Sequence, residues 1–323
     1  MAEYKYTLKK FLKDWALIIG MVVGASAYLI YAEIPALHPA GPFLESFVKH
    51  LQPVLIFIML FLSFARIEPR QLRLHHWMHR VLLLQCSIFV ALALVLAFVP
   101  GLPFRYGLEA LALCVICPTA TACAVVTGKL GGNMAGVVTY TVLINVADAV
   151  LVPLLVPIVH PAAGVSFFSA FISILGKVFP LLILPALAAW AVRFLLPRFH
   201  KWLLGFPNLA FYIWSVSLSL AILMSTRAIV HNNSGGSAVL QVFVASLLAC
   251  VFQFWAGRKI GRRFACPVSA GQAFGQKNTV FGMWMGYTFF SPVTSVAEGF
   301  YSIWHNCYNT WQMYQKRKRK ENI

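Results

Sequence analysis

Residues 80–99 read RVLLLQCSIFVALALVLAFV, and this stretch decides the class of the protein. No charged residue follows Arg80 within it. About 20 apolar residues in succession are what an α-helix needs to cross the hydrocarbon core of a bilayer. A transmembrane β-strand would have about 10 residues and would alternate apolar with polar side chains. Backbone groups in lipid must pair within their own segment, so the stretch predicts a transmembrane helix.

Similar stretches lie on either side and occupy most of the 323 residues. Hydrophobic residues make up 60% of the chain and charged residues only 11%, too few to cover a soluble domain. The apolar run nearest the N-terminus, 14–32, continues as a full span and has no small-residue cleavage site, so we expect no cleaved signal peptide. We predict an all-α membrane protein with ten transmembrane helices, at 14–32, 44–65, 80–99, 107–127, 134–158, 167–195, 209–228, 238–256, 270–289 and 293–314.

Lysine and arginine are distributed unevenly between the loops. When ten spans alternate from a cytoplasmic N-terminus, 21 of the 26 basic residues fall on the cytoplasmic side and three on the other. Lys177 and Lys277 lie inside spans. Basic residues collect on the cytoplasmic side of membrane proteins, so both termini are expected there. This asymmetry explains the net charge of +17 without a nucleic-acid partner, because no basic soluble face is present.

Two of the expected spans contain residues that interrupt a helix. Span 107–127 carries Cys117-Pro118-Thr119-Ala120-Thr121-Ala122, and span 270–289 carries Gly275 followed by Gln276-Lys277-Asn278-Thr279. Each is the fourth span in a set of five. Because five is odd, the second set enters the membrane from the opposite side, as in the inverted repeats of secondary transporters. Paired interruptions of this kind indicate a binding site near the middle of the membrane, although a proline kink and a loosely packed helix would produce the same pattern.

At these residues the chain resembles the bile acid:sodium symporter family. Cys117–Ala122 stands at the family's first helix breaker, with Gly132-Asn133 and Val152–Pro157 at the family's spacing. Gln276–Thr279 stands at the second breaker, followed by Ser291-Pro292 and Ser302–Asn306. The resemblance implies two inverted five-helix repeats in which broken helices four and nine cross.

The family's architecture also implies a division of the chain into two moving parts. Residues 80–158 and 238–315 would form a core, and residues 14–66 and 167–228 a panel against which the core moves, before a basic cytoplasmic tail at 316–323. Such a tail can contact anionic membrane lipids. The substrates implied by the resemblance are bile acids, other sterol conjugates and smaller organic acids.

Several positions depart from the family's sodium ligands. The family's Ser-Asn pair becomes Cys123-Ala124, a Ser on span five becomes Val137, and a Glu on span nine becomes Ala273. A Gln on span nine becomes Lys277, whereas Thr141 is retained and Gln85 matches a Gln on span three. Sodium is a hard cation that needs oxygen ligands, and a nearby ammonium repels it. We therefore expect Lys277 to take the place of a sodium ion and supply its charge.

Charged residues inside spans are costly in lipid and are functional candidates. Thr141, Asn145 and Asp148 lie on one face of span five, at i, i+4 and i+7. We expect this face to point at the crossing, with Asp148 paired to Lys277 directly, through Asn145 or through water. Glu298 in span ten is the rival partner. Both a fixed ion pair and a pair that exchanges a proton during transport are consistent with these positions.

The crossing is the expected binding site. An anionic group would meet the positive N-terminal ends of the half-helices. The expected substrate-binding residues are Thr119, Thr121, Cys123, Gln276, Asn278 and Thr279. The expected ion or surrogate-charge site consists of Gln85, Thr141, Asn145, Asp148 and Lys277. No nucleophile–base pair, phosphate loop or convincing metal-ligand set is present, so we expect neither an enzyme nor a bound metal or cofactor.

These features favour a secondary transporter that moves a small organic anion by alternating access, without the usual sodium sites. Coupling to protons and uncoupled diffusion both remain open. The alternatives are a sodium-coupled symporter with a rebuilt ion site, and a membrane sensor that does not transport. The short loops favour an integral protein of a bacterial inner (plasma) membrane.

Overall fold

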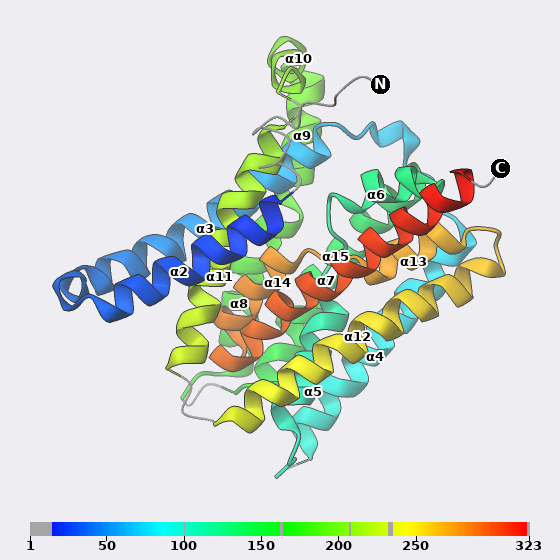
Figure 1. Ribbon diagram of the computed structural model, residues 1–323. Coiled ribbons are helices and arrows are strands. Elements are labelled where there is room, and N and C mark those ends of the chain that lie inside the picture. The colour runs from blue at the N-terminus through cyan, green and yellow to red at the C-terminus, as the bar shows by residue number, and fades with distance from the viewer. Residues whose placement is uncertain (1–14, 100, 162–163, 207, 232–234, 322–323) are drawn as a thin grey trace.

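The computed structural model describes residues 15–99, 101–161, 164–206, 208–231 and 235–321, and these residues are overwhelmingly helical (Figure 1). The predicted basic N-terminus, Lys5 to Lys13, lies outside them. The first part of the chain forms α2 (Ala16–Glu33), α3 (Gly41–Phe64), α4 (His76–Phe98), α5 (Arg105–Ile116), α6 (Cys123–Lys129) and α7 (Met134–Val159). Then follow α8 (Phe167–Leu182), α9 (Leu184–Leu195), α10 (Pro197–Leu204), α11 (Leu209–Val230), α12 (Gly236–Arg262), α13 (Pro267–Gly275), α14 (Thr279–Phe289) and α15 (Pro292–Glu321).

Six helical segments in the described residues are long and apolar enough to cross a bilayer. They are Pro35–Phe64, His76–Phe98, Met134–Val159, Phe167–Leu195, Leu209–Val230 and Gly236–Arg262. Many large apolar side chains on them are exposed, among them Leu83, Phe98 and Leu195. A surface of this kind is stable against lipid and not against water. The chain is therefore an α-helical membrane protein.

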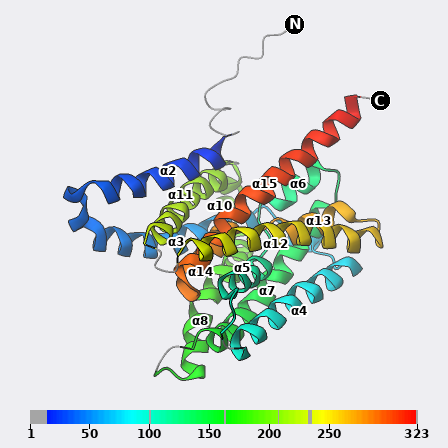
Figure 2. The ribbon, with the colours of Figure 1, turned by 60° about the horizontal axis from the view of Figure 1, so that its bottom comes forward.

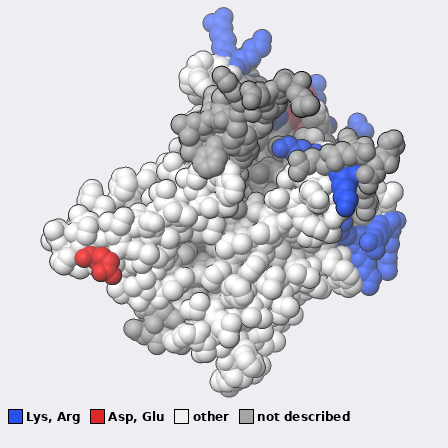
Figure 3. Space-filling model, viewed as in Figure 1, with Lys and Arg blue, Asp and Glu red and all other residues white. Residues whose placement is uncertain are grey.

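The lysine and arginine side chains visible in Figure 3 gather toward one end of the molecule, whereas acidic side chains are visible at the opposite tip. On the face drawn in Figure 3, lysine and arginine lie near α10 and beside the ends of α13 and α15, and the broad middle is uncharged. The positive-inside pattern of the sequence places these residues on the cytoplasmic side, and that orientation stays a prediction. Helix α15 continues to Glu321, so residues 316–321 of the predicted basic tail belong to that helix, and residues 322–323 lie outside the described residues.

The first interruption separates α5 from α6. Pro118 has no N–H group to donate, and it disfavours the helical conformation of the residue before it. Cys117 accordingly has φ −44° and ψ 130°. The chain resumes a helix at Cys123. The predicted span 107–127 is thus two short helices joined by an extended segment.

The second interruption separates α13 from α14. Gly275 ends α13 where the backbone passes so close to α12 that a Cβ would overlap the ring of Phe254. Gln276 is extended, with φ −95° and ψ 104°. The side chain of Asn278 then caps α14 by accepting a hydrogen bond from the N–H of Phe281. Both predicted interruptions are present; the first follows from Pro118 itself, and the second lies where Gly275 packs closely against Phe254.

The helices form two neighbouring groups. Helices α2, α3 and α11 lie together, and α3 also packs against α8 and α9. Helix α12 packs against α5, α13 and α15, while α4 packs against α5 and α7. Figures 1 and 2 show α2, α3 and α11 on one side and α4, α12 and α13 on the other. The two interruptions lie in the second group.

Candidate functional site

The two interrupted segments meet each other. Thr119 and Lys277 form an antiparallel β-bridge. The N–H of Asn278 donates to the carbonyl of Pro118 over 2.8 Å, and the N–H of Ala120 donates to the carbonyl of Gln276 over 2.9 Å. Breaking a helix leaves backbone groups without partners, which is costly away from water. The bridge satisfies some of these groups and holds the interruptions together.

Side chains from other helices satisfy the last carbonyls of α5. Gln253 Nε2 donates to the carbonyl of Cys114 over 3.2 Å. The carbonyl of Val115 accepts from both Lys277 Nζ at 2.9 Å and Gln85 Nε2 at 2.7 Å. The C-terminal end of a helix carries partial negative charge, which a cation stabilises. The ammonium of Lys277 therefore lies where the backbone favours a positive charge.

Lys277 is buried, with only 1% of its surface exposed. Its ammonium lies 5.3 Å from the centroid of the Phe274 ring, a favourable position for a cation. A lysine ammonium has three hydrogens to donate, and the carbonyl of Val115 takes one. The site therefore has donor capacity left for an anionic group or a water molecule.

Within the residues that the structure describes, no direct ion pair joins Lys277 to Asp148 or Glu298. Asp148 and Glu298 are both fully buried, and neither carboxylate oxygen of Asp148 has a hydrogen-bond partner. Asn145 does not bridge Asp148 to Lys277 either, because its amide donates to the carbonyl of Leu182 over 3.4 Å. The expectation failed at Asn145 because this side chain faces α8 and not α14.

Glu298 occupies a tight position beside α14. A Cβ added to Gly282 would lie 2.5 Å from Glu298 Cγ and 2.9 Å from Oε1. The thiols of Cys114 and Cys117 lie beside the same carboxyl group. Lys277, Asp148 and Glu298 thus come from three elements, and none reaches solvent. Isolated buried charges are costly, so the charges of these three groups must be neutralised inside the protein or by a ligand.

Some of the predicted substrate-binding side chains already serve the protein's own structure. Thr119 and Asn278 already hold the interruptions together: Thr119 Oγ1 donates to the carbonyl of Ala273 over 2.6 Å, and Asn278 caps α14. Cys123 is buried with its sulfur 3.9 Å from Thr127 Oγ1. Thr279 is buried at the start of α14, and Thr121 is half-buried in the turn before α6.

Two buried amide atoms at the crossing are unused. Gln276 Oε1 and Asn278 Nδ2 have no hydrogen-bond partner. One is an acceptor and the other a donor, so the pair could serve a ligand with both kinds of group. Buried polar atoms in native proteins are nearly always paired, which makes these two informative.

The predicted ion-site residues are only partly brought together. Gln85 lies at the crossing and accepts a hydrogen bond of 2.7 Å from the hydroxyl of Tyr140. Thr141 instead donates to the carbonyl of Val137 in its own helix. With Asn145 turned to α8, the shared face of α7 does not act as one cluster.

Three residues of the site were missed from the sequence. Tyr140 orients Gln85, and Tyr301 donates to the carbonyl of Gly275 over 2.8 Å at the end of α13. Gln253 donates both to Cys114 and to the hydroxyl of Tyr301. A glutamine inside the apolar span 238–256 was a usable signal. The tyrosines carried none, since they resemble ordinary core aromatics.

A second polar cluster lies at the start of α5. The buried carboxylate of Glu109 accepts from Arg105 Nε at 3.0 Å and from Thr294 Oγ1 at 2.8 Å. His160 Nε2 lies 3.5 Å from Glu109 Oε1. Burial lowers the pKa of His160, the Glu109 carboxylate opposes this, and Arg105 adds to it. The cluster ties the ends of α5, α7 and α15 together.

Comparison with models of known protein families finds no match, and no curated protein matches this chain. The resemblance to bile acid:sodium symporters therefore remains a prediction carried by the motifs themselves.

Proposed function

We propose that this protein is a secondary transporter that moves a small organic anion across the membrane by alternating access. The observation that carries the proposal is the contact between two interrupted helices at Lys277, whose buried ammonium meets the end of α5. Interrupted helices that meet within a membrane protein are the usual setting of a transport site. A buried lysine supplies the charge that attracts an anion and opposes a sodium ion.

The proposed architecture has ten membrane crossings. They are α2, α3, α4, α5 with α6, and α7 in the first set, and α8 with α9, α11, α12, α13 with α14, and α15 in the second. The two sets would be inverted repeats, with the interrupted crossing fourth in each. The grouping of α2, α3 and α11 away from α4, α12 and α13 supports a panel and a core that move against each other.

The anionic group of the substrate would lie near the start of α14. Lys277 would supply charge, and the free amide atoms of Gln276 and Asn278 would supply an acceptor and a donor. The N-terminus of a helix adds partial positive charge. The apolar part of the substrate would lie between core and panel.

The buried carboxyl groups support coupling to protons. If Lys277, Asp148 and Glu298 were all ionised, the cluster would carry one excess negative charge in a region that solvent does not reach. Such a charge is costly, so one carboxyl group would hold a proton or the site would take up a cation. A proton that leaves one carboxyl group when the anion binds or departs would couple proton movement to anion transport.

A rebuilt sodium site is the second candidate, from Gln85, Thr141, Asn145 and Asp148. It is less well supported, because the ammonium of Lys277 shares the carbonyl of Val115 with Gln85 and would repel a sodium ion bound beside it. A sensor that does not transport is the third candidate. It would keep the ligand site and show binding without uptake.

The test is uptake into proteoliposomes that contain the purified protein. The probes are taurocholate, oestrone sulfate and 2-oxoisovalerate, which represent bile acids, sterol conjugates and short organic acids. We expect uptake of at least one probe that requires the protein and is lost in Lys277→Met. Tight binding of a probe without uptake would favour the sensor, and failure of all three both to bind and to enter would overturn the proposal.

A further inference from the structure

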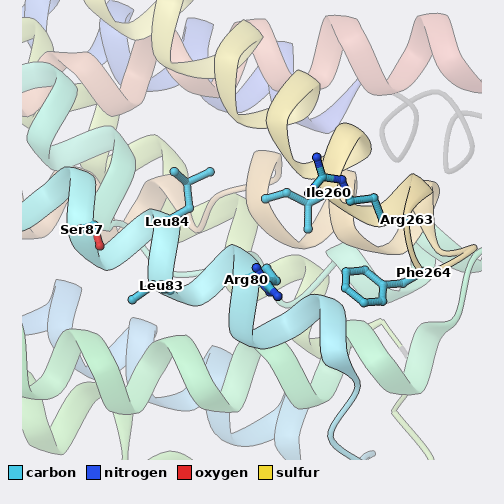
Figure 4. A pocket seen from close by; sticks show the side chains of 7 residues that line it. All are labelled: Arg80, Leu83, Leu84, Ser87, Ile260, Arg263 and Phe264. Atoms are coloured by element: carbon cyan, nitrogen blue, oxygen red, sulfur yellow. The ribbon is translucent and has the colours of Figure 1, made fainter.

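A pocket of about 430 Å³ lies between α4 and the turn that joins α12 to α13. Figure 4 shows Arg80, Leu83 and Leu84 entering it from α4, with Ile260, Arg263 and Phe264 on the opposite side. Its lining residues lie on α4, ahead of the first interruption, and around the turn that precedes α13, ahead of the second. None of its lining residues belongs to the transport site.

The charges of this pocket have one sign. Arg80 and Arg263 are exposed and, within the described residues, neither guanidinium group makes a hydrogen bond or an ion pair. No aspartate or glutamate lines the pocket. Arginine presents a planar fork of donors that fits a phosphate group. Two such forks without protein partners are suited to an anion from outside the chain.

Apart from Ser87, the rest of the pocket wall is apolar. Leu83 has 66% of its surface exposed, and Leu84, Ile260 and Phe264 continue the apolar lining. The ring of Phe264 stacks on His76 with centroids 6.4 Å apart. A free phosphate ion would use the arginines and leave this wall bare. A phospholipid would use both, with its phosphate at the arginines and an acyl chain along Leu83.

We infer that this pocket binds an anionic phospholipid at the cytoplasmic edge of the membrane. Basic pockets between transmembrane helices on that side are suited to acidic lipid headgroups. The inference rests on the proposed orientation of the chain in the membrane and not on transport. The lipid would bridge α4 to the turn before α13, the helix that leads directly to Lys277.

The test measures the apparent melting temperature of the full-length protein in neutral detergent. Added phosphatidylglycerol is compared with phosphatidylcholine and with inorganic phosphate at equal ionic strength. A ligand that binds the folded state raises its apparent stability. We expect phosphatidylglycerol to raise the melting temperature by several degrees, and phosphatidylcholine and inorganic phosphate to have little effect.

Variants separate this pocket from general attraction to a basic surface. Arg80→Gln with Arg263→Gln should lose most of the phosphatidylglycerol effect, and Arg80→Lys with Arg263→Lys should keep part of it. The matched control, Arg198→Gln with Lys201→Gln on α10, removes the same charge from the same end of the molecule. Native mass spectrometry should show one phosphatidylglycerol fewer bound to the glutamine variant than to the control.

Three outcomes would overturn the inference. Equal losses in the pocket variant and the α10 control would indicate a general charge effect. An equal shift with inorganic phosphate would indicate an anion site and not a lipid site. Equal lipid retention by the wild type and the pocket variant would show that the lipid binds elsewhere. All three readouts are independent of uptake, so they can fail while transport stands.

Discussion

The ammonium of Lys277 donates a hydrogen bond of 2.9 Å to the carbonyl oxygen of Val115, the next-to-last residue of α5. The two residues are 162 positions apart and belong to the two different interrupted segments. A positive charge at a helix C-terminus is favourable, and here both groups are shielded from water. Lys277 is thus placed where a bound cation would otherwise stabilise the end of α5.

Sodium should not stabilise the wild-type protein. If Lys277 replaces the ion, the melting temperature in detergent should be the same in sodium and in choline at equal ionic strength. Lys277→Gln removes the repulsion and adds an oxygen ligand, so this variant should gain stability from sodium. A wild-type response at millimolar sodium would instead support the rebuilt sodium site.

The stability that is lost when the Lys277 charge is removed should be partly restored when a buried carboxylate charge is removed as well. Breaking a buried charge balance costs about 3–5 kcal/mol, so Lys277→Met should lower the free energy of unfolding strongly. Neither carboxylate oxygen of Asp148 has a hydrogen-bond partner, whereas the thiols of Cys114 and Cys117 lie beside Glu298. We therefore expect Lys277→Met with Asp148→Asn to recover more stability than Lys277→Met with Glu298→Gln, as measured by thermal unfolding in detergent. A greater recovery with Glu298→Gln would identify Glu298 as the counter-charge.

Two buried tyrosine hydroxyls should respond in opposite ways. Tyr140→Phe removes the hydrogen bond to Gln85 and leaves an unsatisfied oxygen, which should cost about 1–3 kcal/mol. Tyr287 is the matched control, because its buried hydroxyl has no partner in the structure. Tyr287→Phe should be neutral or slightly stabilising by the same measurement. Equal effects would show that the Gln85 contact does not contribute to stability.

His160 should make the free energy of unfolding fall in mild acid. Its pKa in the folded protein is lowered from 6.5, chiefly by burial, so the unfolded chain binds a proton more readily. Stability from this group is complete above pH 6.5 and falls as the pH drops below it. The melting temperature of wild type should therefore decline between pH 7.5 and pH 5.5 more steeply than that of His160→Gln. Parallel curves for the two proteins would contradict this assignment.

Local sequence determined the class of the protein and the places where its helices run and break. A bilayer demands long apolar segments, and this demand can be recognised one stretch at a time, as at residues 80–99. The first break was equally local, because Pro118 removes a donor. The glycine and polar residues from Gly275 to Thr279 marked the second break in the sequence, and the structure shows that Gly275 packs there against Phe254 of α12.

Only the tertiary structure decided which side chains meet at the crossing. Helical spacing places Thr141, Asn145 and Asp148 on one face, yet Asn145 donates to α8 and Asp148 makes no hydrogen bond. That outcome depends on how α7 is rotated about its axis and on which helices lie beside it. Helical periodicity in the sequence gives neither. Lys277 could be identified from the sequence as a buried charge, because a lone cation in an apolar segment is conspicuous. Its partner is a backbone carbonyl, and since every residue carries one, only the fold could select Val115.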